Sequence, residues 1–288
     1  MSPLKRQESI EDGCRRLVCE SIETAIRELT RKDGSTRAAA ESVRQADAGI
    51  ALIESELPRE VTRRDRRLLD RIAAEIASAL RPGLLLKHYD KLAGAAGVSI
   101  DSGQGKAFRK ALARSQVAGL SMNAPNRSFD PIVYRLVADL AELRGQVGDW
   151  PVFEPDPARP PIGLRRAYTH ARRDAQLVPA PAEHAASRLR TLELHLAFLN
   201  RCCPAMVKPH RKLIQAAAEQ LDQRATRSAL AEMLTSTEKS DWAKPLLDKL
   251  NDPSGTEDTT KLLAQAFAES PAAFNNRIAA YWRSWRAD

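Results

Sequence analysis

The chain has 288 residues, of which 43% are hydrophobic and 28% charged, and its formal net charge is +8 at pH 7. This apolar content is enough for a folded core and excludes a disordered chain. No run of about 18 apolar residues occurs and the first residues are polar, so we expect neither a membrane span nor a secretory signal.

Helical periodicity runs through the first part of the chain. In 9–31 the apolar residues recur at the spacing of one helix face, with Ser9 as N-cap and Asp33-Gly34 after the end. Asp130-Pro131 combines an N-cap with a proline at the first helical position, so another helix begins there. The helices expected here are 9–31, 35–56, 59–80, a short one from the hinge Pro82-Gly83 through Leu92, 104–120 after a loop at 93–105, and one from Pro131 to about Gly145–Gly148, preceded by a polar turn at 123–126.

The proline-dense stretch 149–161 is interpreted as a linker. It separates two halves, 1–148 and 162–288, that echo one another, because Arg15-Arg16 has a counterpart in Arg165-Arg166. Strand-like alternation is missing, so the fold class is all-α: two pseudo-repeated helical-bundle halves in a single domain, 1–288. The helices expected in the second half are 162–177, 183–202, 207–235, 239–250, 257–269 and 271–286.

Motifs for catalysis, cofactors and metals are absent from the sequence. It has no phosphate-binding glycine loop, no nucleophile elbow and no histidine pair at metal-ligand spacing. The four cysteines form no CxxC and lie among apolar neighbours, which favours buried thiols in a reducing cytoplasm. We therefore expect no enzyme activity, no cofactor and no metal.

Arginine clusters are the clearest chemical feature. From Arg159 to Arg173 the chain has five arginines and one histidine with no acid between them, several of them seven residues apart. Residues seven apart share a helix face, and such rows suit an extended polyanion because guanidinium groups bind phosphates bidentately. A second arginine ladder at four-residue spacing has acids interleaved, so we interpret it as a solvated face with salt bridges. This second ladder consists of Arg59, Arg63, Arg67 and Arg71.

The order of the segments resembles the CHAD domain, the conserved-histidine α-helical domain, over nearly the whole chain. In PIGLRRAYTHARRDA, the residues Arg165, Arg166, Tyr168 and Arg172 stand at matching places. The other segments that carry the resemblance are SIEDGCRRLVCESIETAIREL, TRAAAESVRQADAGIALI, EHAASRLRTLELHLAFLNRCCP and LLAQAFAESPAAFNNRIAAYWRSW.

The resemblance implies a protein without enzyme activity that binds inorganic polyphosphate in a basic cavity between two similar halves. It also implies a cytoplasmic location, with polyphosphate granules as a place of association. Nucleic acid is a weaker candidate, because the sequence has few aromatic residues for base stacking. The binding residues expected are Arg15, Arg16, Arg37, Arg44, Arg165, Arg166, Arg172, Arg188 and Arg190.

The two family signatures differ from this sequence at several positions, which leaves an alternative open. Arg37 and Glu183 stand where the family has its histidines. Basic positions of the signatures are replaced by Ala40, Glu41, Ala186 and Ser187. The alternative is therefore a degenerate CHAD scaffold that serves as a structural or protein-interaction module.

Overall fold

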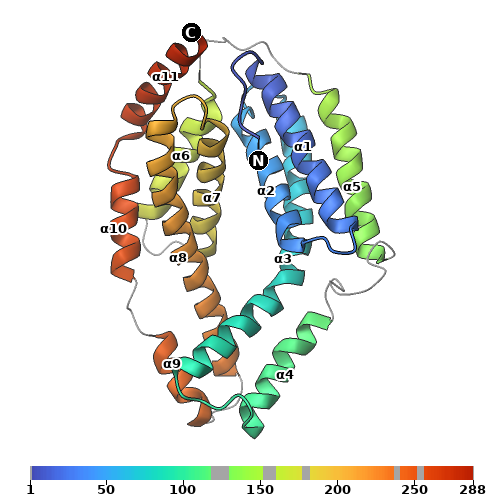
Figure 1. The fold of residues 1–288 in the computed structure, drawn as a ribbon, viewed down its shortest axis with the longest axis vertical. Helices are drawn as coiled ribbons and strands as arrows, with labels where there is room; N and C mark the ends of the chain where they lie inside the picture. The colour runs from blue at the N-terminus through green and yellow to red at the C-terminus, as the bar shows by residue number, and fades with distance from the viewer. Residues whose placement is uncertain are drawn as a thin grey trace.

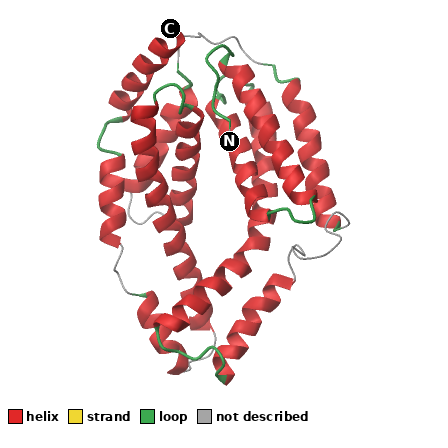
Figure 2. Ribbon diagram, viewed as in Figure 1, coloured by secondary structure: helices red, strands yellow, loops and turns green. Residues whose placement is uncertain are grey.

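The computed structural model describes residues 2–117, 130–151, 160–176, 182–236, 241–251 and 256–287. Across these ranges the protein is all-α, as predicted: α-helices and one short 3-10 helix, with no strand (Figure 2). No helix within them is long and apolar enough to cross a membrane.

The helices follow one another with short connections (Figure 1). The first part of the chain has α1 (Ile10–Thr30), α2 (Thr36–Leu52), α3 (Arg59–Ala95), α4 (Gly103–Val117) and α5 (Pro131–Gly148). The second part has α6 (Ile162–Gln176), α7 (Ala182–Phe198), α8 (Pro204–Ser236), η2 (Asp241–Ala243), α9 (Lys244–Leu250), α10 (Thr256–Ala266) and α11 (Pro271–Ala287).

Side-chain caps fix three of the predicted helix starts. The Ser9 hydroxyl accepts a hydrogen bond from the Asp12 amide at 3.0 Å, and the Ser35 hydroxyl accepts one from Ala38 at 3.2 Å. Asp130 caps α5 by accepting from the Ile132 amide at 2.8 Å, with Pro131 at the first helical position. Each cap satisfies an amide that has no partner within its helix.

The predicted end of a helix before Pro82-Gly83 is wrong, because α3 is one helix of 37 residues with Pro82 inside it, although its lower part runs at an angle to its upper part (Figure 1). Proline removes one hydrogen bond from a helix, but packing on both sides compensates here. Ile76 packs in one hydrophobic core before the proline, and Leu85 and Tyr89 pack in another after it. The predicted loop is accordingly shorter, and its Gly97 adopts a positive φ of 65°. The predicted turn at 123–126 and most of the predicted linker lie outside the described residues.

The main core combines residues from both predicted halves. Its members come from α1, α2, the first part of α3 and α5, together with α6, α7, α8 and α11. Figure 1 shows these groups as two columns. Contacts of α2 with α6 and α7 join them, and the buried ring of His195 lies 2.8 Å from the Ala48 carbonyl through Nε2. The halves therefore share one core; the pseudo-repeat and the division at 149–161 stay predictions.

A second, smaller core lies at the lower end of the molecule (Figure 1). We call this part the lower lobe, made of residues 81–117, 229–236 and 241–251. Tyr89 and Phe108 lie at its centre, with ring centroids 5.1 Å apart, and Phe108 also packs against Trp242. Because α3 contributes residues to both cores, this long helix connects the lower lobe to the rest of the protein.

Candidate functional site

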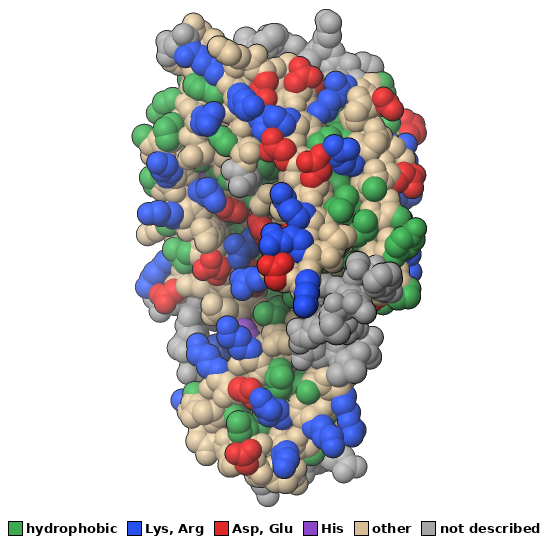
Figure 3. Space-filling model, turned by 45° about the vertical axis from the view of Figure 1, so that its right-hand side comes forward, with side chains coloured by type: hydrophobic (Ala, Val, Ile, Leu, Met, Phe, Trp, Pro, Cys, Tyr) green, Lys and Arg blue, Asp and Glu red, His purple; other side chains and the backbone are tan. Residues whose placement is uncertain are grey.

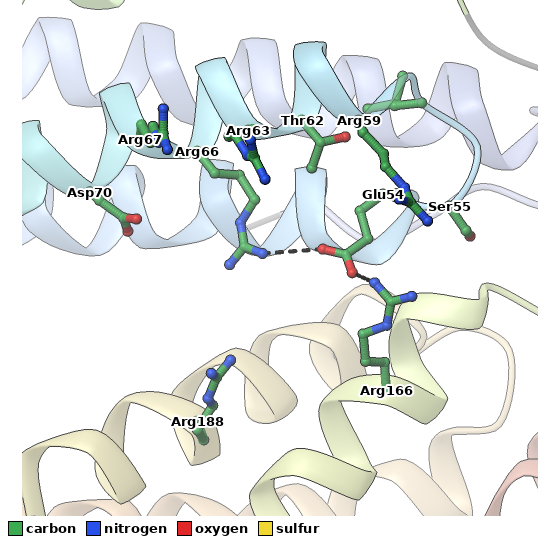
Figure 4. Close-up of a pocket in the computed structure, with 11 residues that line it drawn as sticks. Glu54, Ser55, Arg59, Thr62, Arg63, Arg66, Arg67, Asp70, Arg166 and Arg188 are labelled. Carbon is green, nitrogen blue, oxygen red and sulfur yellow. Dashed lines mark hydrogen bonds and ion pairs between the residues drawn. The ribbon is translucent and has the colours of Figure 1, made fainter.

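An arginine-lined pocket opens between the first part of α3 and the pair α6–α7 (Figure 4). Its volume is about 660 Å³. Six of the lining residues are arginines and two are acids, which makes the lining cationic. The lining consists of Glu54, Ser55, Leu57, Arg59, Thr62, Arg63, Arg66, Arg67, Asp70, Arg166 and Arg188.

Three arginines of α3 are exposed and have no acid partner among the described residues: Arg59, Arg63 and Arg67. Their four-residue spacing places them along one helix face, each about 6 Å further along the axis. In Figure 4 the three come from the same helix above the pocket. They form a row of free guanidinium groups at the pocket wall.

Among the interleaved acids of α3, Asp65 points away from this row, whereas Asp70 lines the pocket and forms no ion pair with the row among the described residues. Asp65 is buried on the opposite face, where it accepts hydrogen bonds from the Trp150 indole at 2.9 Å and from Arg64 at 2.7 Å. The interpretation of this ladder as a salt-bridged face is therefore right for Arg71, which pairs with Asp139 at 3.0 Å. It is wrong for the three arginines of the pocket.

Arg66 is the paired arginine at the base of the pocket. Its guanidinium donates to Asp47 at 2.7 and 3.2 Å and to Glu54 at 3.1 Å. Burial is the largest influence and disfavours the charge, but the Asp47 hydrogen bond together with the charges of Asp47 and Asp70 outweighs it and raises the pKa of Arg66. Burial and the nearby Asp47 carboxylate raise the pKa of Asp70. Glu54 also forms an ion pair with Arg166, so this carboxylate bridges α3 and α6 (Figure 4).

The opposite wall carries arginines that already have a carboxylate nearby. Asp174 is buried, and its oxygens lie 3.5 Å from Arg173 Nε, 3.7 Å from Arg188 Nε and 3.3 Å from His184 Nε2. Burial, followed by the charges of Arg188, Arg173 and Arg166, lowers the pKa of His170 beside them. The acid-free run 159–173 thus ends at Asp174, whose carboxylate partly neutralises Arg173, while Arg165 and Arg172 have no ion pair among the described residues.

Two of the nine predicted binding residues line the pocket: Arg166 and Arg188. Arg37 and Arg165 are exposed outside its lining, and Arg172 is half-buried outside it. The structure therefore does not bring the nine predicted residues together at this pocket.

The other four predicted residues are engaged in contacts within the protein. Arg16 binds Glu8, Glu20 and the Pro3 carbonyl, and Arg15 donates to the Trp150 carbonyl. Arg44 pairs with Glu41 at 2.7 Å and Arg190 with Asp222 at 3.1 Å. These four side chains hold helices or turns and lie outside the pocket lining.

Sequence reasoning missed the contribution of α3, which supplies Arg59, Arg63, Arg66 and Arg67. The signal was present as a ladder at four-residue spacing. Counting the interleaved acids without assigning each to a helix face concealed it, because residues one or two positions apart point in different directions.

The described residues contain no group of three or more histidine, cysteine or acidic side chains that could hold a metal ion. Two histidines serve as packing residues instead. Burial lowers the pKa of His195 to about 4, and burial with the Arg277 charge does the same for His210. The His210 ring packs against Tyr168 and Phe274, which stack with centroids 4.0 Å apart. Both imidazoles are therefore neutral near pH 7.

Comparison with protein-family models gave no match, and comparison with curated proteins gave none. Among solved structures, the fold is similar to that of PptA from Streptomyces chartreusis, with a TM-score of 0.58 and 14% identity. The similarity covers 95% of this chain and 99% of that one, so it extends over the whole architecture. At this identity it supports a shared fold alone.

Proposed function

We propose that this protein binds a polyanion without catalysing a reaction, that the arginine-lined pocket is the binding site, and that inorganic polyphosphate is the ligand. The observation that carries the proposal is the row of Arg59, Arg63 and Arg67, whose guanidinium groups line a cavity without acid partners among the described residues. Like charges along a packed helix repel, and a bound anion would relieve that repulsion.

The chemistry of the lining fits a chain of phosphates. Each guanidinium presents a fork of donors that matches two phosphate oxygens and keeps its charge at every physiological pH. Arg166 and Arg188 lie on the wall opposite the free row, so one chain could meet cations on both sides (Figure 4). The described residues that line the pocket include no aromatic side chain, which favours a ligand without bases over single-stranded nucleic acid.

The CHAD resemblance stays a prediction and agrees with this ligand class. Under the same proposal the protein is cytoplasmic and associates with polyphosphate granules. The binding residues become Arg59, Arg63 and Arg67 of α3 together with Arg166 and Arg188.

A degenerate scaffold that binds a protein partner is the second candidate. Several predicted binding arginines support it because acids of the same chain already engage them, as Glu41 engages Arg44 and Asp222 engages Arg190. On this alternative the basic pocket is left over from a lost activity.

Filter binding with labelled polyphosphate, with DNA and RNA as competitors, tests the proposal. The wild-type protein should retain polyphosphate at low salt in the presence of either nucleic acid. Arg63→Glu with Arg67→Glu should weaken binding by about a hundredfold, because two charge-assisted contacts become repulsive. Lys208→Glu with Lys212→Glu is the matched control, since these exposed lysines of α8 lie outside the pocket at the same spacing. A wild-type protein that retains no polyphosphate would favour the scaffold.

A further inference from the structure

We propose that the lower lobe carries a second anion-binding surface, on the exposed face of α4 and the last turns of α3, that binds the same polyphosphate chain outside the pocket. We call it the α3–α4 surface, formed by Arg81, Lys87, Lys91, Lys106, Lys110 and Arg114. This inference rests on the proposed function and concerns which chains the protein prefers.

Most of the net charge of the protein lies in this part of the sequence. Residues 81–117 contain seven Lys and Arg against two acids, Asp90 and Asp101, a net of +5, whereas the whole chain has +8. In Figure 3 the charged side chains on the lower part of the molecule are mainly Lys and Arg, with acidic and hydrophobic side chains between them. A patch of one sign at this density attracts anions over roughly a Debye length, about 8 Å at physiological salt.

The geometry of α4 keeps its cations in solvent. Phe108 and Leu112 are buried in the core of the lower lobe, which turns the other face outwards. That face carries Lys106, Lys110 and Arg114 at four-residue spacing, with no acid anywhere in Gly103–Val117. A phosphate chain laid along the helix would meet a cation about every 6 Å.

Of the two acids in 81–117, Asp90 is already paired, and Asp101 is exposed near Arg109. Arg109 of α4 binds Asp90 of α3 at 2.9 and 3.1 Å, which fixes the two helices together and occupies the nearby carboxylate. Lys87 and Lys91 of α3 flank that carboxylate in the sequence and are exposed. The remaining positive charge therefore has no acid partner among the described residues.

The long helix α3 connects this surface to the pocket. Arg67, Ser78 and Arg81 are exposed and lie within about 60° of one another around the helix, and exposed Lys91 lies about 80° around it from Arg81. The rise of an α-helix makes Arg67 to Arg81 about 21 Å and Arg81 to Lys91 about 15 Å. The acid Glu75 between them is engaged by Arg135 of α5. A short anion can occupy the pocket alone, whereas a long chain can follow α3 to both sites.

The side chains of the lower lobe favour a phosphate chain over other polyanions. Its aromatic residues Tyr89 and Phe108 are buried and Trp242 packs against Phe108, so these rings are not offered to bases. Among the described residues of the lower lobe, Leu84 is the exposed large apolar side chain. One such side chain gives too little apolar surface for insertion into a membrane. Charge without stacking or apolar contacts suits inorganic polyphosphate.

The test compares ligands of different length. Lys106→Glu with Lys110→Glu is measured against Lys208→Glu with Lys212→Glu, which carries the same change of charge and spacing on α8. The two α4 lysines are exposed and outside the core, and circular dichroism checks that the helices are kept. We expect the Kd for long-chain polyphosphate to rise about tenfold in the α4 variant, with the Kd for tripolyphosphate within about twofold of wild type.

Each other outcome separates this inference from the proposed function. If the α4 variant binds long chains like the α8 control while Arg63→Glu with Arg67→Glu abolishes binding, the second surface is wrong and the pocket stands. If the α4 variant loses affinity for duplex DNA but not for polyphosphate, the surface binds nucleic acid and the inference is wrong. If the wild-type protein binds neither long-chain polyphosphate nor tripolyphosphate, both the proposed function and this inference fail.

Discussion

The two walls of the pocket carry arginines whose surroundings in the sequence and in the structure are opposite. On α3, Arg63 and Arg67 are surrounded by acids in the sequence, yet they have no acid partner among the described residues. On α6, Arg166 of the lining and Arg173, seven residues further along the helix, belong to an acid-free run, yet Glu54 pairs with the first and Asp174 with the second. The comparison teaches that helix faces and tertiary neighbours, rather than sequence neighbours, decide which charges remain available to a ligand.

Low pH should disturb the pocket most, because its two walls face each other only while α2 and α7 stay packed. His195 is buried at that contact with its Nε2 on the Ala48 carbonyl, and Asp47 and Arg66 are the charges that act on it. Its pKa is lowered to about 4 in the folded state from 6.5, so the unfolded chain binds the proton first as pH falls. The contribution of the neutral His195 to the free energy of unfolding is therefore fully present above pH 6.5. It is lost progressively as the pH falls from 6.5 to 4.

This histidine should contribute a loss of about 2 kcal/mol in the free energy of unfolding between pH 7 and pH 5. Urea unfolding at both pH values measures it. In His195→Gln the amide can donate to the same carbonyl but does not titrate, so the pH dependence should shrink by about that amount. An equal pH dependence in variant and wild type would contradict this role, because His210 alone would then account for it.

Single charge reversals test which arginines, those of α3 or those of α6, bind the ligand. Arg67→Glu should weaken polyphosphate binding by about tenfold, because it removes a free guanidinium from the pocket and adds a repelling carboxylate. Arg165→Glu makes the same change on an exposed arginine of α6 outside the lining and should alter the Kd by less than about twofold. Fluorescence anisotropy with labelled polyphosphate gives both values. Equal losses would restore the predicted α6 row as the binding face.

Removing a carboxylate should have a smaller effect in the opposite direction. Glu54 forms ion pairs with both Arg66 and Arg166 in the lining of the pocket. Glu54→Gln keeps the shape and removes the charge, so polyphosphate affinity should rise by about threefold, with some loss of stability. Glu41→Gln, which frees Arg44 outside the pocket, is the control. A lower affinity in Glu54→Gln with unchanged circular dichroism would mean that the carboxylate orients the arginines for binding.

Much of the fold could be predicted because its signals are local. Ser9, Ser35 and Asp130 cap helices where the sequence placed them, and the all-α class followed from the periodicity of the apolar residues. The predicted break at Pro82 failed because a proline inside a helix is tolerated where two cores hold the helix on either side. That support comes from residues far along the chain, such as Leu230 and Leu246.

The site was harder to predict for the same reason. The unpaired row on α3 depends on Asp65 turning inwards to meet Trp150, which lies 85 residues further along the chain. The pairing of Arg166 depends on Glu54, which follows α2. Neither contact has a signature in the spacing of the arginines, so local charge counting missed the free row on α3 and the pairing of Arg166, although Arg165 and Arg172 have no ion pair among the described residues.

The salt dependence of polyphosphate binding tests the central claim most directly, because it counts the cations that a polyanion meets. Arg59→Gln, Arg63→Gln and Arg67→Gln together remove three free charges from α3 without adding acids. If these three contact the ligand, the slope of log affinity against log salt should become shallower by about 2, since each contact to a single-stranded polyanion contributes roughly 0.7. The matched triple variant Arg165→Gln, Lys208→Gln and Lys212→Gln should keep the wild-type slope. A wild-type slope in the α3 variant would contradict the assignment of this pocket as the binding site.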